Sequence, residues 1–275
     1  MLRTYFTHFR NGLTLTLLLM LGLASAARAA EPELVLLIQP ILSEQRTRQV
    51  YQPLADYIGA VAGRPCRIQT LPNFLAYWDV VRRGQYDFAL DAAHFTDYRA
   101  QKMGFSILAK IPDGVSYSLI VNDDNLIFDP LELAGRRVAT LGPPSIGAAR
   151  LNAMYPNPVR QPVGVEVGDS EAGIQLLRQR KVDAAILPTP FVSQQMGQGG
   201  IAVVLTTEPI PHIALSAAAR VPNAVKESIR TALVRADRTD AGRNMLKQIG
   251  FERFDPATAD IYANQRNVLS QYWGF

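Results

Sequence analysis

Reactive and metal-binding residues are scarce in this sequence, and their scarcity excludes several functional classes. Among 275 residues there are one cysteine, Cys66, and three histidines. A single thiol cannot form an internal disulfide, and metal sites usually need three or four converging ligands. The sequence also lacks the H-E-x-x-H, C-x-x-C and G-x-x-x-x-G-K-[ST] motifs. We therefore predict no metal and no cofactor, and a Cys66 thiol that is buried in a strand and inert.

The sequence has little sign of a membrane-spanning helix. The apolar run 13–23 is about eleven residues long, whereas a spanning helix needs roughly twenty. It follows a basic segment with Arg3 and Arg10 and precedes Ala27-Arg28-Ala29, a pattern typical of signal-peptide cleavage. We predict that residues 1–29 are a signal peptide and that the mature protein is periplasmic. An uncleaved anchor is the alternative.

The net charge is also small when residues 1–29 are left out of the count. The leader contains three arginines and no acid, so the net charge falls from +4 to +1. No basic stripe with interleaved aromatic residues is present, so nucleic acid is not an expected partner. The mature chain is long enough for one large domain or two lobes, and we expect it to be a monomer.

Apolar runs alternate with helical periodicity along the mature chain and predict an α/β fold. Buried strands are predicted over 34–39, 66–71, 86–90 and 105–110, with helices between them. That order predicts a parallel sheet with helices on both faces. A crossover near 117–121 is expected to lead to a second lobe, and segment 208–217 to return to the first. Helices are then predicted over 224–236, 241–249 and 257–269.

The stretch 131–155 carries the clearest signal for ligand binding. A strand is predicted over 137–141, a glycine-proline turn over 142–144 and a helix that begins near Ser145. The first turn of a helix has unpaired N–H groups and the positive end of the helix dipole, which together bind anions. Ser145 either donates its hydroxyl to such an anion or merely caps the helix.

Other polar and aromatic residues are predicted near the carboxyl ends of these strands, where open α/β sheets bind ligands. Ser43 follows the first strand, and Phe74 opens the helix after the second. His94 and Tyr98 follow the third strand. Thr189 follows a further strand that is predicted over 182–187. Each residue has a structural alternative, because the aromatic rings can belong to the core and His94 can be a helix-entry residue.

A serine hydrolase that uses Ser145 is the catalytic alternative. The sequence around Ser145 reads G-x-x-S-x-G, one residue longer than the G-x-S-x-G of a nucleophile elbow. His94 and His212 are the histidines outside the leader, and His212 lies in the return segment, poorly placed to reach Ser145. We therefore expect a binding protein and not an enzyme.

Five short motifs occur in order along the mature chain. They are YQPLADY at 51–57, RGQYDFA at 83–89, LAGRRVA at 133–139, VDAA at 182–185 and PIP at 209–211. With these motifs the chain resembles the periplasmic phosphate-, phosphite- and phosphonate-binding proteins of ABC importers, the PhnD-like group of the type II periplasmic binding protein superfamily.

The resemblance implies a two-lobed α/β fold in which each lobe is a mostly parallel sheet flanked by helices. Residues 30–118 and 208–275 would form lobe 1, and residues 119–207 would form lobe 2. The implied function is capture of a small oxyanion (phosphate, phosphite or a simple alkylphosphonate) and its delivery to an ABC permease in the inner membrane. A ligand-sensing periplasmic protein of a signalling system is the alternative.

The resemblance also implies which residues bind the ligand. The family uses hydroxyls and N–H groups at the start of a second-lobe helix, and the matching positions here are Ser145, Ile146 and Gly147. Ile146 replaces a hydroxyl residue of the family pattern, and Tyr98 matches an aromatic hydroxyl from the first lobe. No acid stands at 188–189 to bind an ammonium group. The implied ligand is therefore an anion without an aminoalkyl substituent.

Overall fold

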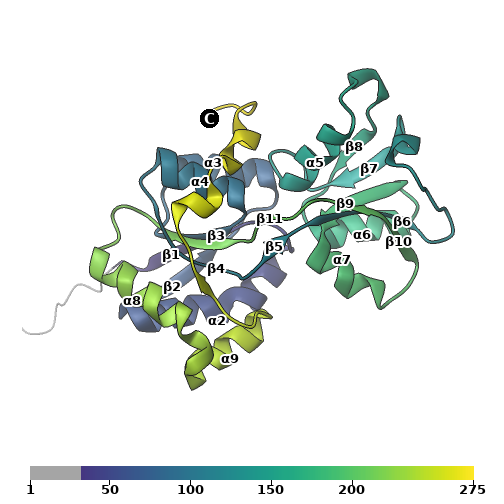
Figure 1. The fold of residues 1–275 in the computed structure, drawn as a ribbon. Helices are drawn as coiled ribbons and strands as arrows, with labels where there is room; N and C mark the ends of the chain where they lie inside the picture. Colours follow the sequence, from purple (N-terminus) through teal and green to yellow (C-terminus); the bar gives the residue numbers. More distant parts are fainter. Residues whose placement is uncertain (1–31) are drawn as a thin grey trace, which may run out of the picture. The chain divides into compact units, whose positions relative to one another are not determined.

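The computed structural model describes residues 32–275, so the predicted signal peptide lies outside the described residues. Within it, Glu33–Phe275 form one compact unit that contains a six-stranded sheet, a five-stranded sheet and a two-stranded ribbon (Figure 1). Helices flank both large sheets. This arrangement agrees with the predicted α/β fold class.

The first sheet is parallel at one edge and antiparallel at the other. Its order is β13-β4-β12-β3-β1-β2, and β1, β2 and β3 pair in parallel, as the alternating strands and helices predict. β12 lies antiparallel between β3 and β4, so the return segment forms the interior of this sheet. The strands are β1 (Leu34–Ile38), β2 (Cys66–Gln69), β3 (Phe88–Asp91), β4 (Ser106–Lys110), β12 (Ala214–Ala217) and β13 (Asp255–Pro256).

The helices of the first sheet begin and end where local sequence signals place them. Side chains of Ser43 and Asn73 accept hydrogen bonds from first-turn N–H groups of α2 and α3. Both helices stop at left-handed glycines, Gly63 and Gly84, a conformation that glycine adopts without steric cost. The helices are α2 (Glu44–Ala62), α3 (Phe74–Arg83), α4 (Ala93–Lys102), α8 (Asn223–Val234) and α9 (Asp240–Ile249).

The second sheet has the order β10-β6-β9-β7-β8. Strands β7, β8 and β9 are parallel, whereas β6 runs antiparallel to both β9 and β10. The sequence pattern did not predict α7, which begins directly at the end of β9. The elements are β6 (Tyr117–Asn122), β7 (Arg137–Thr140), β8 (Val163–Glu166), β9 (Ala184–Pro188), β10 (Ile201–Thr206), α5 (Ile146–Met154), α6 (Ser170–Arg178) and α7 (Thr189–Met196).

Two antiparallel segments connect the sheets. β5 (Gly114–Val115) pairs with β11 (Ile210–Pro211) as a short ribbon. Gly114 fits this ribbon because a Cβ there would lie 2.9 Å from Pro209 Cβ and 3.0 Å from the Ile210 carbonyl oxygen. The predicted division between residues 118 and 119 falls inside β6, and the division between 207 and 208 falls between β10 and β11.

The predicted helix over 257–269 is wrong. The segment forms two short 3₁₀ turns, η4 (Ala259–Tyr262) and η5 (Gln265–Leu269), separated by Asn264 with φ of +67°. A contact to α4 holds the segment in this form, because Arg266 N donates to Asp97 Oδ2 at 2.9 Å. Just beyond the segment, Trp78 Nε1 of α3 donates to Trp273 O at 2.9 Å. Tertiary contacts therefore override the local helical periodicity.

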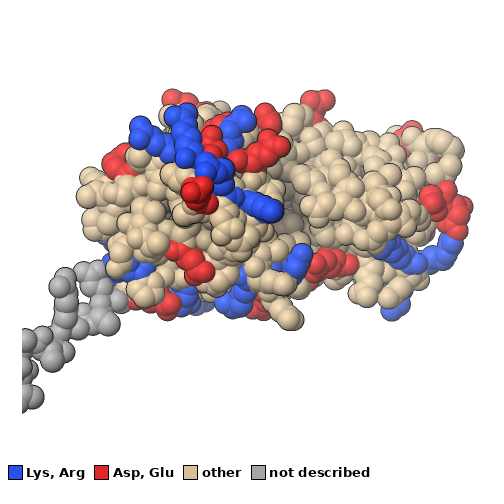
Figure 2. All heavy atoms as spheres, turned by 90° about the horizontal axis from the view of Figure 1, so that it is seen from below, with Lys and Arg blue, Asp and Glu red and all other residues tan. Residues whose placement is uncertain are grey.

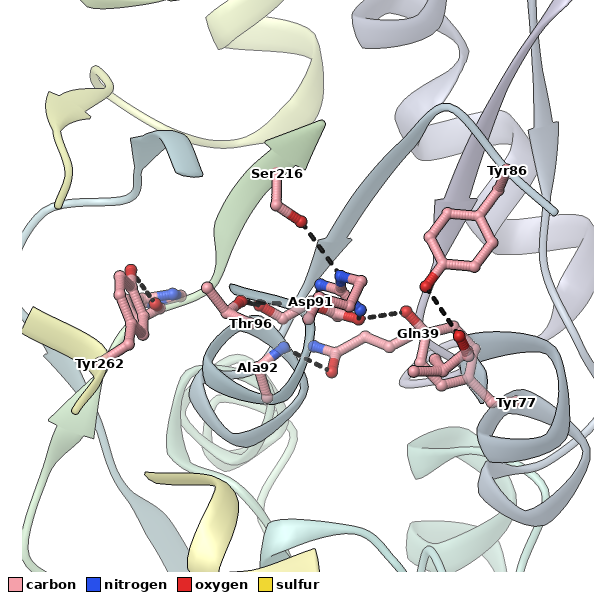
Figure 3. A network of polar contacts seen from close by, with 11 residues as sticks. Gln39, Tyr77, Tyr86, Asp91, Ala92, Thr96, Ser216 and Tyr262 are labelled. Atoms are coloured by element: carbon pink, nitrogen blue, oxygen red, sulfur yellow. Dashed lines mark hydrogen bonds and ion pairs between the residues drawn. The ribbon is translucent and has the colours of Figure 1, made fainter. Parts of the chain in front are cut away.

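A buried ion pair fixes the end of β3 against α4 (Figure 3). Asp91 is the last residue of β3, and its carboxylate accepts two hydrogen bonds from Arg99, one of them 2.7 Å long. Both side chains are fully buried. Tyr77 also donates to Asp91, and Arg99 Nε donates to Ser216 Oγ at 3.2 Å. The desolvated charges are therefore compensated by a network from β3, α3, α4 and β12.

We predict that Arg99→Ala destabilises the protein by about 3–5 kcal/mol, because it leaves the Asp91 carboxylate buried without its cation. Urea denaturation followed by circular dichroism measures this loss. Arg243→Ala, which removes an exposed ion pair with Asp240, is the matched control and should cost less than about 1 kcal/mol. Equal losses in the two variants would contradict a structural role for the buried pair.

Candidate functional site

The amino end of α4 is an unusual helix start. Ala92 precedes it and provides no side-chain cap. Phe95 and Thr96 N–H groups donate to the Ala92 carbonyl, but the Ala93 and His94 N–H groups have no hydrogen-bond acceptor among the described residues. Both residues are fully buried. Buried N–H groups without a partner are rare in folded proteins, so this end of α4 is suited to an anion or a water.

The amino end of α5 offers the same groups from the second sheet. Ser145 Oγ accepts a hydrogen bond from Ala148 N at 3.2 Å, which makes Ser145 the cap while its own O–H proton stays available. The Ile146 and Gly147 N–H groups have no acceptor among the described residues. Gly147 is closely surrounded, since a Cβ there would lie 3.3 Å from Ile186 O and 3.4 Å from the Tyr117 ring.

These two helix ends meet at a direct hydrogen bond. His94 Nε2 donates to the Pro144 carbonyl oxygen at 3.0 Å, and the side chains of His94 and Ser145 are 0% and 1% exposed. Burial lowers the pKa of His94 to about 3, so the ring is neutral at neutral pH. Its Nδ1 is then a buried acceptor with no partner among the described residues.

A second contact between the two halves lies at the start of α6. Ser170 N donates to Ile41 O at 2.9 Å, and Ser43 N donates to Glu171 Oε2 at 3.4 Å. Ser43 itself caps α2, because Arg46 N donates to its hydroxyl. Ser170 Oγ is buried and has no partner among the described residues. The loop after β1 and the start of α6 are therefore in contact.

Two of the other predicted residues have their side chains engaged in packing. Phe74 is buried and packs against Tyr77 and Phe95. The Tyr98 hydroxyl donates to Gly274 O at 3.4 Å, and its ring packs edge-on against Trp78. These contacts place Phe74 and Tyr98 in the aromatic packing around α3 and α4.

Thr189 also has its hydroxyl engaged within the second sheet. Its Oγ1 lies 2.9 Å from Ser118 Oγ, and its N–H donates to Ser116 O at 2.9 Å. Of the eight predicted ligand-binding residues, the structure thus brings together His94, Ser145, Ile146 and Gly147. Ser43 lies at the separate contact with α6, and Phe74, Tyr98 and Thr189 are engaged elsewhere.

A cavity of about 470 Å³ opens beside the connecting segments, and none of the eight predicted residues lines it. Figure 2 views the molecule from below, the side on which Figure 1 shows α2, α7 and α9, and shows a recess between the two halves. Residues from both halves and both connecting segments form its wall, among them Gln39, Tyr51, Tyr117, Phe191 and His212.

Sequence reasoning missed these lining residues, although some local signals were present. Gln39 is the first polar residue after an apolar strand, and His212 lies in the return segment between two proline-containing stretches. Neither signal states which way the side chain faces. Tyr51 and Tyr117 have ordinary core-like spacing, so the pattern alone could not separate them from packing residues.

The strand end at Asp91 offers no free carboxylate. Arg99 and Tyr77 already donate to its oxygens.

Among the described residues no group of three or more histidine, cysteine or acidic side chains is positioned to hold a metal ion. Within the same residues, no helix is both long enough and apolar enough to cross a bilayer. At the meeting of α4 and α5, the N–H groups without acceptors can form hydrogen bonds to an anion.

Comparison with protein families gives one match over most of the chain. The model of a family described as "ABC transporter, phosphonate, periplasmic substrate-binding protein" matches residues 36–262. A search among curated proteins gives no match.

Comparison with solved structures supports the same fold. PhnD1 from Prochlorococcus marinus (MIT 9301), in complex with methylphosphonate, aligns with a TM-score of 0.74 at 13% identity, over 86% of this chain and 97% of that one. A binding protein component of an ABC phosphonate transporter from Pseudomonas aeruginosa aligns with a TM-score of 0.69 at 15% identity, over 86% and 85%. An ancestral arginine-binding protein aligns with a TM-score of 0.60 at 14% identity, over 80% and 98%. The chain therefore has the two-lobed fold of type II periplasmic binding proteins.

We predict that acid destabilises the fold through its buried histidines. Burial holds the pKa of His94 near 3, and burial with Lys110 nearby lowers the pKa of His212 to about 4. The unfolded chain binds these protons near pH 6.5. The free energy of unfolding should therefore be at its full value above pH 6.5 and fall by about 1.4 kcal/mol per pH unit for each histidine as the pH drops toward 4.

Urea denaturation between pH 7.5 and 4.5 measures this slope. His94→Gln replaces the ring with an amide that can still donate to Pro144 O, and it should remove the contribution of one histidine from the slope. Because both proteins contain the same carboxylates, the difference between their slopes isolates His94. An unchanged slope in His94→Gln would show that His94 is not held neutral in the folded protein.

Proposed function

The chain belongs to the family of periplasmic substrate-binding proteins of phosphonate ABC transporters, and from that premise we propose which ligand it binds and where. The family implies a small ligand and a membrane permease as partners, and a periplasmic location. We propose phosphate, phosphite or a simple alkylphosphonate as the ligand, held where α4 and α5 meet. We further propose that the protein is a monomer, that it has no nucleic-acid partner and that its signal peptide is cleaved after Ala29 during export.

One observation carries this proposal: two buried helix amino ends face each other across the two halves. The N–H groups of Ala93 and His94 on one side, and of Ile146 and Gly147 on the other, lack acceptors among the described residues. Both helix dipoles have their positive ends at this point. A tetrahedral oxyanion has enough acceptor oxygens to pair with all four N–H groups and with the Ser145 hydroxyl.

His94 supports a protonated oxyanion over a fully ionised one. Its Nε2 proton is committed to Pro144 O, which leaves Nδ1 as an acceptor among groups that otherwise donate. Monoanionic phosphate and phosphonates carry a P–O–H group that can donate to such a nitrogen, and sulfate carries none. We therefore propose that the site discriminates against sulfate, because sulfate would leave Nδ1 unpaired.

The carboxylates of the region support an anion without an ammonium group. The acid at the end of β3, Asp91, is paired with Arg99, and residues 188–189 provide no acid. A 2-aminoethylphosphonate ammonium group would therefore find no free carboxylate at either of these two positions. The same reasoning disfavours the hydrolase alternative, because Ser145 caps α5 and no histidine hydrogen bonds to it among the described residues.

We also propose that residues 30–118 with 208–275 and residues 119–207 move as two lobes about β5 and β11. Both connecting segments are short, and the contacts His94–Pro144, Ser170–Ile41 and Ser43–Glu171 are among those that opening would break. Small-angle scattering should give a smaller radius of gyration at saturating ligand. Identical scattering with and without a ligand that calorimetry shows to bind would contradict lobe closure.

Ser145 variants test the ligand site. Ser145→Ala should weaken oxyanion binding by roughly tenfold to a hundredfold, because a hydrogen bond to a charged group contributes about 1.5–3 kcal/mol. Ser145→Asp keeps a good helix cap but places a negative charge beside the anion, so it should abolish binding while the protein stays folded. Ser145→Thr retains both the cap and the hydroxyl and should bind within a few fold of the parent.

Isothermal titration of these variants is done with phosphate, phosphite, methylphosphonate, 2-aminoethylphosphonate and sulfate. We expect the first three to bind more tightly than the last two. Ser193→Ala on the exposed face of α7 is the control. Tightest binding of the aminophosphonate would overturn the ligand assignment. Unchanged binding in both Ser145→Ala and Ser145→Asp would show that Ser145 is only a cap.

A further inference from the structure

The cavity beside the connecting segments is much larger than a tetrahedral anion requires. Its volume of about 470 Å³ lies within the range of roughly 300–1,000 Å³ that is typical of sites for organic ligands. Much of its wall is apolar, with aliphatic side chains from β1, the loop after it, α2 and α9, and rings from α7 and the loop after α9. These apolar residues include Ile38, Leu42, Val50, Phe191, Ile249 and Phe251.

The polar groups inside this cavity are uncharged and incompletely paired. Gln39 Oε1 accepts from Ala92 N at 3.1 Å, whereas its Nε2 has no acceptor among the described residues. His212 Nδ1 accepts from Ile213 N at 2.8 Å, so the ring proton is on Nε2, which also lacks an acceptor there. The hydroxyls of Tyr51 and Tyr117 form no hydrogen bond with the described residues. Each of these four groups is neutral and can donate a hydrogen bond to a molecule in the cavity.

The cavity lining includes two charged side chains. Arg46 and Glu171 are the charged side chains in its lining, and both are already engaged: Arg46 Nη1 donates to Gln49 Oε1 at 2.9 Å, and Glu171 accepts from Ser43 N. Both residues are exposed, and Figure 2 shows charged side chains around the recess. Because both side chains are exposed and already hydrogen-bonded, neither offers a desolvated counter-charge to a charged substituent, which would lose its own hydration in the cavity.

The cavity borders the amino ends of both helices that form the proposed anion site. Ala92, directly before α4, is part of its wall. Tyr117 is also part of the wall, and its ring lies 3.4 Å from the Cβ position of Gly147 in the first turn of α5. A substituent attached to an anion at these helix ends can therefore extend into the cavity.

We propose that the cavity receives an uncharged, oxygen-bearing organic substituent of the ligand, so that the preferred ligand is a hydroxylated organophosphonate or phosphate monoester. This inference rests on the proposed function, because it needs the anion at the ends of α4 and α5. Hydroxyl or carbonyl oxygens of the substituent accept from Gln39 Nε2 and His212 Nε2, and its carbon atoms contact the apolar wall. Each such neutral hydrogen bond should tighten binding roughly threefold to tenfold.

Titration with ligands that differ in the substituent tests this inference. We expect 2-hydroxyethylphosphonate and glycerol 3-phosphate to bind at least about threefold more tightly than methylphosphonate, and 2-aminoethylphosphonate to bind more weakly than 2-hydroxyethylphosphonate. Val50→Phe places a ring in the cavity from α2 and should abolish the preference for glycerol 3-phosphate over methylphosphonate. Val203→Phe, on exposed β10 outside the cavity, should retain that preference.

Two different failures are distinguishable. If methylphosphonate binds but the hydroxylated ligands show no gain, or if Val50→Phe leaves their preference intact, the cavity is not a substituent site and the proposed function still stands. If none of the phosphonates and phosphates binds to the folded protein, the proposed function is wrong and this inference is overturned with it. Circular dichroism and thermal unfolding establish that both variants are folded.

Discussion

The burial of the Asp91–Arg99 ion pair is the constraint on which the rest of the structure depends. Two charges removed from water are tolerated only when their remaining hydrogen-bonding positions are filled, and here Tyr77 and Ser216 fill them. These partners come from α3 and β12, so the pair fixes the position of α4 relative to the sheet. The amino end of α4 follows directly after Asp91, and its orientation toward α5 is therefore set by this pair.

Several helices of the described chain have a side-chain cap at their first turn, but not all of them do. Side chains of Ser43, Asn73, Asp169 and Thr239 accept first-turn N–H groups of α2, α3, α6 and α9. α4 and α7, which follow the parallel strands β3 and β9, have no such cap. α8 also lacks a cap but follows a surface turn. At α4 the missing cap leaves buried N–H groups that a bound anion can pair with, whereas α5 keeps the Ser145 cap and offers the Ile146 and Gly147 N–H groups beside it.

Local signals predicted the fold well but only part of the candidate site. Continuous apolar runs and capping residues gave most strands and helices, and the turn before Ser145 gave the start of α5. The local pattern leaves open whether Tyr98 faces a ligand or the core, and in the structure its hydroxyl donates to Gly274 O, which is 176 residues away in the sequence. The cavity was missed for the same reason: Val50 and Phe251 meet only in the folded chain. The prediction of a continuous helix over 257–269 is wrong because Asp97, far away in the sequence, binds Arg266 and holds the segment in another form.

The position of β12 has a consequence for the order in which the protein can fold during synthesis. Residues of the second sheet, from β6 to β10, are continuous in sequence and can complete their pairing as soon as they emerge. The first sheet begins earlier but must keep β3 and β4 apart until β12 is made, more than a hundred residues later. During that interval the edges of β3 and β4 that later pair with β12 are exposed and can pair wrongly. A chaperone that covers these edges would act on the amino-terminal third of the chain.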